Sequence, residues 1–157
     1  MTIKLGTKVR DRVTGFTGIV DNKAVFLYGC TRVCIQPPVK EDGTIPESYM
    51  IDEPQLEVLD PTPVMEVPEE PMAIVKMGNL VVDPISNIKA TVTGRAVYLN
   101  GCSRVLLEPT EKHKDVDNYW VDEHQVVDTG KTLLKNNNIK PEDTRKTGGP
   151  SRANSKY

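Results

Sequence analysis

The chain contains an internal repeat, and this feature constrains its fold more than any other. Residues 6–37 align without a gap onto residues 78–109 at an offset of 72, and 12 of the 32 aligned pairs are identical. After a net deletion of two residues, the match resumes with Tyr49 on Tyr119. A repeat of this length indicates that one supersecondary unit has been duplicated, so one argument about the fold must serve both copies. A chemical group that occurs in one copy only is a poor candidate for a mechanism common to both.

The repeat divides the 157 residues into four segments. We expect a first unit over residues 1–59, a Pro- and Glu-rich linker over 60–76, a second unit over 77–128 and a basic, flexible C-terminal arm over 129–157. Units of this size are close to the lower limit for an independent hydrophobic core. We therefore expect each unit to gain stability by docking on the other or on a partner.

Each unit is predicted to be built from β-strands. Apolar and polar residues alternate over residues 8–13, and β-branched and apolar residues continue through 17–20 and 24–27. In the second copy Asn100-Gly101, the preferred pair for a type I′ hairpin turn, follows an apolar strand. Five short strands in about 55 residues, with one helical turn before the last, describe a small SH3-like barrel. The predicted fold is therefore all-β: two tandem SH3-like barrels joined by a Pro-rich linker, with an irregular C-terminal arm.

Charge divides the chain into an acidic body and a basic arm. Residues 131–157 contain seven Lys or Arg and two acidic residues, so by difference residues 1–130 contain 13 basic and 20 acidic residues. Binding to nucleic acid needs clustered Lys and Arg, and only the arm has this character. We expect the arm to bind an acidic surface of a neighbouring subunit, because its single aromatic residue gives little support for stacking on bases. The candidate residues of the arm are Lys131, Lys135, Lys140, Arg145, Lys146, Arg152 and Lys156.

The sequence gives no signal for targeting or for a membrane. Residues 1–6 lack the apolar run of a signal peptide, and no stretch approaches the ~18 apolar residues of a membrane helix. We predict a soluble protein that is made in the cytosol and does not contact a membrane. Cys30, Cys34 and Cys102 are interpreted as small buried hydrophobic residues, with an intermolecular disulfide as the alternative.

Two pairs of carboxylates occur at equivalent positions of the copies, Asp52-Glu53 and Asp122-Glu123. Neighbouring residues on a strand point to opposite faces, so neither pair forms the facing carboxylates that a hydrolase needs. We expect each Asp to cap a helical turn, and each Glu to be solvated or to pair with Arg32 or Arg104 on the next strand.

Other catalytic or metal-binding patterns are absent from the sequence. His113 and His124 occur in one copy only, and the cysteines lack the spacing of a zinc site. Gly130-Lys131-Thr132 resembles the end of a P-loop, but Gln125 stands where that motif needs its first glycine. We therefore expect no metal, no cofactor and no enzymatic activity.

The candidate interaction surface combines aromatic residues near the hairpin with the Asp-Glu corner of each copy, where SH3-like barrels often present a groove. The alternative is that the aromatic side chains are the bulky parts of two small cores. The candidate residues are Phe26, Tyr28, Arg32, Tyr49, Asp52, Glu53, Tyr98, Arg104, Tyr119, Trp120, Asp122 and Glu123.

Four sequence patterns stand out: Leu-Gly-x-Lys-Val-x-Asp-x-Val-Thr-Gly-Phe-x-Gly-Ile-Val at 5–20, Tyr-Leu-x-Gly-Cys-x-Arg-Val at 98–105, Trp-x-Asp-Glu at 120–123 and Thr-Gly-Gly-Pro at 147–150. With these patterns the chain resembles small, mostly uncharacterised proteins of tailed bacteriophages and prophages, many of which have one such unit. The first strand and its turn are also similar to KOW and Tudor-type SH3-like barrels, which bind nucleic acid or protein. The second copy departs from the pattern at Asn87, Ile88 and Ala90, so a ligand site on that turn is expected in unit one only.

These patterns and the resemblance predict a non-enzymatic phage protein that binds other proteins. The preferred role is a virion component, such as a decoration, cement or head–tail connector subunit, found in the host cytoplasm during synthesis and then in the particle. Its partners would be capsid or tail subunits, or further copies of itself. One alternative is an intracellular anti-defence protein that binds a host factor or sequesters a nucleotide signal. The other is a KOW-like binder of nucleic acid, which would act through the basic arm.

Overall fold

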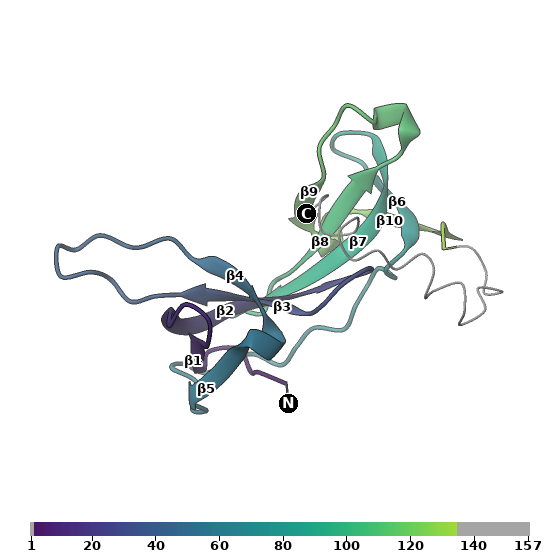
Figure 1. Cartoon of the computed structure of the whole chain (residues 1–157). Coiled ribbons are helices and arrows are strands. Elements are labelled where there is room, and N and C mark those ends of the chain that lie inside the picture. Colours follow the sequence, from purple (N-terminus) through teal and green to yellow (C-terminus); the bar gives the residue numbers. More distant parts are fainter. Residues whose placement is uncertain (1, 135–157) are drawn as a thin grey trace, which may run out of the picture.

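The structure, a computed structural model, describes residues 2–134 and is built from β-strands (Figure 1). The first half contains β1 (Lys8–Asp11), β2 (Thr17–Phe26), β3 (Arg32–Gln36), β4 (Tyr49–Asp52), the 3₁₀ turn η1 (Glu53–Gln55) and β5 (Leu56–Asp60). The second half contains β6 (Asn79–Asp83), β7 (Ile88–Tyr98), β8 (Ser103–Pro109), η2 (Glu111–His113), β9 (Tyr119–Asp122), η3 (Glu123–Gln125) and β10 (Val127–Thr132). The all-β prediction is confirmed, and no helix among the described residues has the length and apolar character needed to cross a membrane.

Both halves pair their strands in the same order. The order is β5-β1-β2-β3-β4 in the first half and β10-β6-β7-β8-β9 in the second, with every neighbouring pair antiparallel. The halves then join through a further antiparallel pairing, β2 with β7. All ten strands therefore belong to one open sheet, and the prediction of two closed SH3-like barrels is not confirmed.

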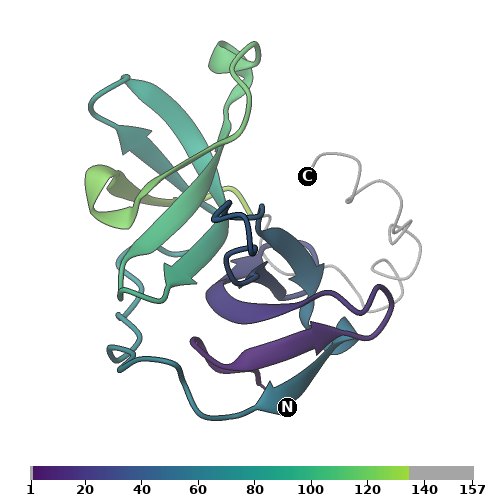
Figure 2. The same ribbon diagram turned by 90° about the vertical axis from the view of Figure 1, so that its left-hand side faces the viewer.

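Each half has a hydrophobic core of its own. In the ribbon the two halves form two lobes (Figure 2). Every buried residue of the first core has a buried counterpart in the second. The pairs are Ile3 and Val75, Val9 and Val81, Val20 and Val92, Val33 and Val105, Ile35 and Leu107, and Leu56 and Val126. The duplication thus preserved the interior position by position.

The turn between the first two strands keeps its geometry in both halves although the second half lacks its glycine. Gly15 has φ +76°, and its N–H donates to Asp11 O (2.8 Å). Asn87 occupies the equivalent position with φ +60°, and its N–H donates to Asp83 O (2.7 Å). Asn is among the few non-glycine residues that tolerate this left-handed conformation, so the departure seen in the sequence does not remove the turn.

The β7–β8 hairpin differs from its prediction. Gly101 has φ +88°, but Asn87 is the only non-glycine residue with positive φ in residues 2–134, so Asn100 cannot belong to a type I′ turn. Tyr98 N–H donates to Cys102 O (2.9 Å) and Gly101 N–H donates to Tyr98 O (2.9 Å). These bonds define a three-residue loop in which the glycine forms the bulge.

The linker lies against both halves of the molecule. Val64 N–H donates to Gly6 O (3.0 Å) in the first half, and Arg95 of β7 donates to Pro71 O (2.8 Å) in the second. A Cβ at Gly101 would lie 3.2 Å from Pro68, so the β7–β8 hairpin also approaches the linker. At the other end of the chain, β10 runs to Thr132, four residues into the segment predicted to be the arm.

Candidate functional site

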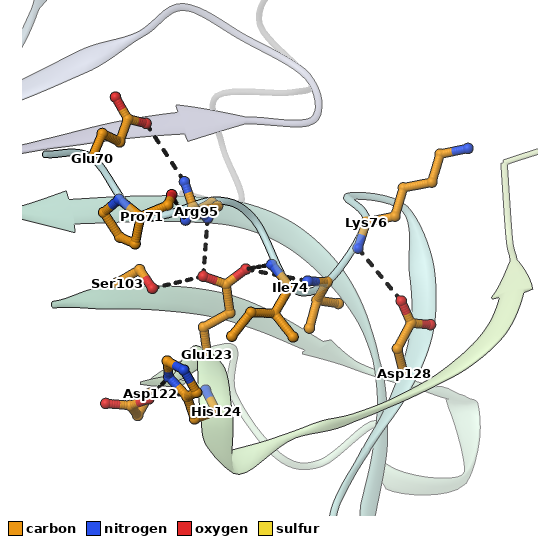
Figure 3. Close-up of polar contacts among 11 residues, drawn as sticks. Glu70, Pro71, Ile74, Lys76, Arg95, Ser103, Asp122, Glu123, His124 and Asp128 are labelled. Atoms are coloured by element: carbon orange, nitrogen blue, oxygen red, sulfur yellow. Dashed lines mark hydrogen bonds and ion pairs between the residues drawn. The ribbon is translucent and has the colours of Figure 1, made fainter.

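Glu123, one of the candidate site residues, is fully buried at the start of η3 (Figure 3). Its carboxylate accepts hydrogen bonds from Ser103 Oγ (2.6 Å), Arg95 Nε (3.1 Å), Ile74 N (2.8 Å) and Val75 N (3.2 Å). Burial opposes ionisation, but these donors outweigh it and lower the pKa of Glu123. The prediction that this Glu is solvated or pairs with Arg104 is wrong, because the sheet turns its side chain inward and β7 supplies the cation.

Glu53 repeats this arrangement with less burial. Its Oε1 accepts hydrogen bonds from Ile3 N (2.7 Å) and from Lys23 Nζ (3.1 Å), and about 16% of its side chain is exposed. Lys23 and Arg95 are equivalent residues of the repeat, as are Ile3 and Val75. Each Glu accepts hydrogen bonds from a cation of its own half and from one or two backbone N–H groups. We call this set of residues the glutamate anchor. Each anchor fixes the segment that precedes the first strand of its half.

The aspartates beside the anchors point to solvent. The side chain of Asp52 is 51% exposed and pairs with Arg32 (3.1 Å) on β3, directly across the ladder. Asp122 accepts a hydrogen bond from His124 N (2.9 Å) and caps η3, whereas Asp52 makes no such cap. In each pair the Asp and the Glu therefore point in opposite directions, and the Glu is already bound within an anchor. This arrangement does not bring two carboxylates to one substrate.

A second repeated carboxylate site, centred on Asp11 and Asp83, was not among the residues predicted from the sequence. Asp11 accepts hydrogen bonds from Gln55 Nε2 (2.7 Å), from Val13 N (3.0 Å) and from the Thr14 hydroxyl and N–H. The Thr14 hydroxyl is the main cause that lowers the pKa of Asp11 to about 2. The signal was available, since an Asp on the first strand and a Gln after the Asp-Glu step occur in both copies.

Asp83 is the counterpart in the second half. It accepts hydrogen bonds from Gln125 Nε2 (3.1 Å), Ser86 Oγ (2.9 Å), Ile85 N (3.0 Å) and Tyr119 Oη (3.0 Å). Burial opposes its ionisation, but the donors lower its pKa overall. These contacts link the first turn of the half to the segment before its last strand. Tyr119, a candidate interaction residue, is thus part of the internal polar structure.

The remaining aromatic candidates do not form one groove. Phe26 at the end of β2 makes an edge-to-face contact with Trp120 of the other half, with ring centroids 6.2 Å apart. Tyr98 lies under the guanidinium of Arg104, 5.3 Å from the ring centroid. Tyr28, in the β2–β3 loop, is 59% exposed. The structure thus places these residues at the contact between the halves, on the face of β7 and on a hairpin tip.

Tyr49 belongs to a different surface in the first half. Its ring packs edge-to-face on Phe16 (5.1 Å between centroids), and Phe16 lines a shallow groove of about 730 Å³ beneath the long β3–β4 loop. Figure 1 shows this loop projecting away from the second half. The groove is lined by Phe16, Thr17, Pro37, Pro38, Val39, Lys40, Glu41, Asp42 and Pro46. Its lining is mainly apolar, and Val39 and Ile45 of the loop are 60% and 77% exposed.

The equivalent place in the second half has the opposite character. A hollow of about 510 Å³ beneath the β8–β9 loop is lined by Glu108, Pro109, Glu111, Lys114, Val116, Asp117 and Asn118. Ile88 stands where the first half has Phe16, so the aromatic pair does not recur. The two outer loops are therefore the place where the duplicated halves differ most in chemistry.

The structure brings together no set of nucleophile, base and metal ligands among residues 2–134. No group of three or more His, Cys, Asp or Glu there could hold a metal ion. His113 lies on η2 and His124 on η3, and Gly130-Lys131-Thr132 lies within strand β10.

The cysteines and the arm complete the candidate groups. Cys34 is buried as predicted, but Cys30 and Cys102 are exposed, so that interpretation is wrong for these two; all three are free thiols. Of the candidate arm residues, Lys131 lies in β10, and the other six lie outside the described residues.

Comparison with known proteins gave no match to a protein family, to a curated protein or to a solved structure.

Proposed function

We propose that this protein is a non-enzymatic protein-binding module, and that the apolar groove of the first half is its main contact surface. The observation that supports this proposal is the difference between the outer loops. The groove of the first half is mainly apolar and includes Phe16 and the exposed Val39, although Lys40, Glu41 and Asp42 also line it. The hollow at the equivalent site of the second half is mainly polar. A contiguous exposed apolar surface is costly in a soluble protein unless it is covered by a partner.

We further propose that each half is an SH3-like unit. The strand order within each half and the 3₁₀ turn before its last strand support this assignment. The open sheet that joins the halves is then two such units fused edge to edge. This arrangement holds the two outer loops at fixed positions on one chain, so that two weak contacts can act together on one assembly.

The resemblance to tailed-phage proteins supports one biological setting, a virion component that bridges neighbouring subunits. In this role the groove would bind an apolar segment of a capsid or tail subunit. Mass spectrometry of purified particles tests it directly, because a decoration, cement or connector subunit is present in many copies per particle. Absence of the protein from purified particles would contradict the virion role and leave the intracellular anti-defence role as the better proposal.

The groove and the loop over it are tested by charge substitution on two exposed side chains, Val39 in the groove lining and Ile45 in the loop. The double variant Val39→Asp/Ile45→Asp should fold normally and lose particle incorporation, because two buried carboxylates would have to be desolvated in the complex. Ile85→Asp is the matched control, since Ile85 is also 77% exposed but lies in the second half, away from the groove. Normal incorporation of the double variant would show that the groove is not the contact surface.

A further inference from the structure

The contact between the halves is formed by the outer edges of β2 and β7. Its five residue pairs are Asn22 and Tyr98, Lys23 and Val97, Ala24 and Ala96, Val25 and Arg95, and Phe26 and Gly94. The ladder continues beyond both ends, because Leu99 N–H donates to Asp21 O (2.8 Å) and Leu27 N–H donates to Thr93 O (2.8 Å). We call residues 21–27 and 93–99 the junction.

The junction is symmetric with respect to the repeat. Ala24 and Ala96 are equivalent residues at the offset of 72, and they lie opposite each other. The donors of the two end hydrogen bonds, Leu27 and Leu99, are also equivalent, as are their acceptors. Each half therefore offers the same strand, in the same register, to the other. A contact of this kind, in which both partners use the same surface about a two-fold axis, is the contact of a symmetric dimer.

The same local irregularity prepares both strands for this contact. The pairing of β2 with β3 shifts register between Val20 and Asn22, and that of β7 with β8 shifts between Val92 and Gly94. These bulges are equivalent in the repeat and lie at the start of the junction. A bulge bends its strand and increases its twist, so it separates the part of the strand that serves its own half from the part that reaches the other.

Charge does not oppose the symmetry. The cations Lys23 and Arg95 lie close to the axis, where two like charges would repel, but each is paired with the Glu of its own half, Glu53 or Glu123. The junction therefore brings together two neutralised sites. Arg95 also pairs with Glu70 of the linker (3.6 Å), but Lys23 is neutralised within the first half alone, so a pair of identical first halves would be neutral in the same way.

Side-chain size also fits a pair of identical first halves. In the molecule, Phe26 lies over Gly94, and Tyr98 lies opposite Asn22, so each aromatic residue faces a smaller one. A second copy of β2 in the same register would place its Asn22 opposite Phe26. The arrangement of an aromatic side chain against a smaller one is retained at both ends of the ladder.

We propose that the junction is a self-complementary dimer interface carried within one chain, and that its partner of the same chemistry is the β2 edge of a second copy. The linker then serves to supply this partner at high local concentration rather than to create the contact. The inference concerns a surface other than the groove and does not rest on the proposed function.

The first test separates the contact from the linker. Val64 and Met65 are 62% and 50% exposed, so a protease recognition sequence inserted between Met65 and Glu66 can be cut in the folded full-length chain. We expect the cut halves to remain together in native mass spectrometry and size-exclusion chromatography. Separation into single halves at micromolar concentration would overturn the proposal.

The second test detects the pair of identical halves through a disulfide at the axis. The end hydrogen bonds place Ala24 and Ala96 at a non-hydrogen-bonded position, where Cα atoms are about 4.5 Å apart. This spacing falls within the range of natural disulfides. In a chain with Cys30→Ser, Cys34→Ala and Cys102→Ser, the added Ala24→Cys should, after cutting and exchange, crosslink two N-terminal halves to each other.

Two controls make each result decisive. The uncut double variant Ala24→Cys/Ala96→Cys should crosslink within one chain, and its failure to do so would overturn the register on which the proposal rests. Val13→Cys, at a side chain 75% exposed outside the junction, should give no crosslinked dimer. Crosslinking of the double variant without any dimer of the cut Ala24→Cys halves would show that the contact is specific to unlike halves, and would refute the inference.

Discussion

The two halves have equivalent hydrophobic cores, but their glutamate anchors differ in burial and in the number of hydrogen bonds. In the second half the anchor Glu123 is fully buried, accepts two backbone N–H groups and pairs with an Arg that also reaches Pro71 of the linker. In the first half Glu53 is partly exposed, accepts one backbone N–H and pairs with Lys23. Arg can bind several acceptors at once, whereas Lys acts as a single charge. The second half and the linker are therefore joined in one network.

The surfaces of the halves differ in a second way. The β3–β4 loop of the first half lies over a mainly apolar groove, whereas the hollow beneath the β8–β9 loop of the second half is mainly polar. The comparison indicates that the two cores are equivalent position by position, whereas the surfaces beneath the outer loops have diverged.

The largest effect is expected from removal of the anchors. Glu123→Ala should lower the free energy of unfolding by about 3–5 kcal/mol, because it leaves two backbone N–H groups and the Ser103 hydroxyl without their acceptor, and leaves Arg95 with the exposed Glu70 as its only ion-pair partner. Glu53→Ala should cost about 1–3 kcal/mol, since the Glu53 side chain is itself partly exposed and accepts a hydrogen bond from one backbone N–H only. Urea unfolding followed by circular dichroism and by the fluorescence of Trp120 measures both.

The conservative variants Glu123→Gln and Glu53→Gln are the matched controls, because they keep the acceptor oxygen but lose the charge. Each should cost less than the corresponding Ala variant. Equal losses for Glu123→Ala and Glu53→Ala would contradict the expectation that the anchor of the second half contributes more to stability.

A smaller effect is expected at the close approach of β2 to β3. A Cβ at Gly18 would lie 2.6 Å from Gln36 O, so Gly18→Ala should force the strands apart and destabilise the protein by about 1–3 kcal/mol. The second half already has Ala90 at this position. Ala90→Gly, the matched control, should cost only about 0.5–1 kcal/mol. A neutral Gly18→Ala variant would show that the two ladders have the same spacing.

Much of the fold could be predicted from the sequence because the repeat doubles each local signal. Alternation of apolar and polar residues identified strands in the first copy, and the repeat extended them to the second. The junction could not be predicted in this way. Residues 21–27 carry no sequence pattern that distinguishes pairing with another half from exposure to solvent.

The candidate site was predicted less well, for a physical reason. A charged residue is usually solvated, so Glu53 and Glu123 were expected at the surface. Their burial depends on cations from a strand that is distant in sequence and on backbone N–H groups of the N-terminal segments, which no local pattern reveals. The groove of the first half was not predicted because Phe16 lies between the predicted strands 8–13 and 17–20, whereas in the folded chain its ring packs on Tyr49 of β4.

A further difference concerns the first turn of each half. Gly15 has positive φ with no atom near its missing Cβ, so Gly15→Ala should cost about 1–2 kcal/mol through backbone strain alone. Gly15→Asn, which copies the second half, should cost clearly less, because Asn87 adopts this conformation there. Thermal unfolding of the two variants side by side provides the measurement. Equal destabilisation by Ala and Asn would mean that the two turns are not equivalent.

The smallest effect is expected at the equivalent carboxylates Asp11 and Asp83, where the loss of stability appears only at acidic pH. The folded protein holds the pKa of Asp11 at about 2, below its ordinary value of 3.8, so the unfolded chain takes up this proton first as the pH falls. The stability that Asp11 contributes is therefore complete above about pH 4 and is lost progressively toward pH 2. Urea midpoints measured from pH 7 to pH 2 should show this loss.

Thr14→Ala should reduce the acid-dependent loss, because it removes the hydrogen bond that does most to lower the pKa of Asp11. Thr14→Ser retains a hydroxyl and should keep the wild-type slope. The counterpart of Thr14 in the second half is already a serine, Ser86, which donates to Asp83 (2.9 Å). If Thr14→Ala kept the wild-type slope while Thr14→Ser did not, the hydroxyl would not be the cause of the lowered pKa of Asp11. The Thr14 and Ser86 hydroxyls would then not have equivalent roles in the two halves.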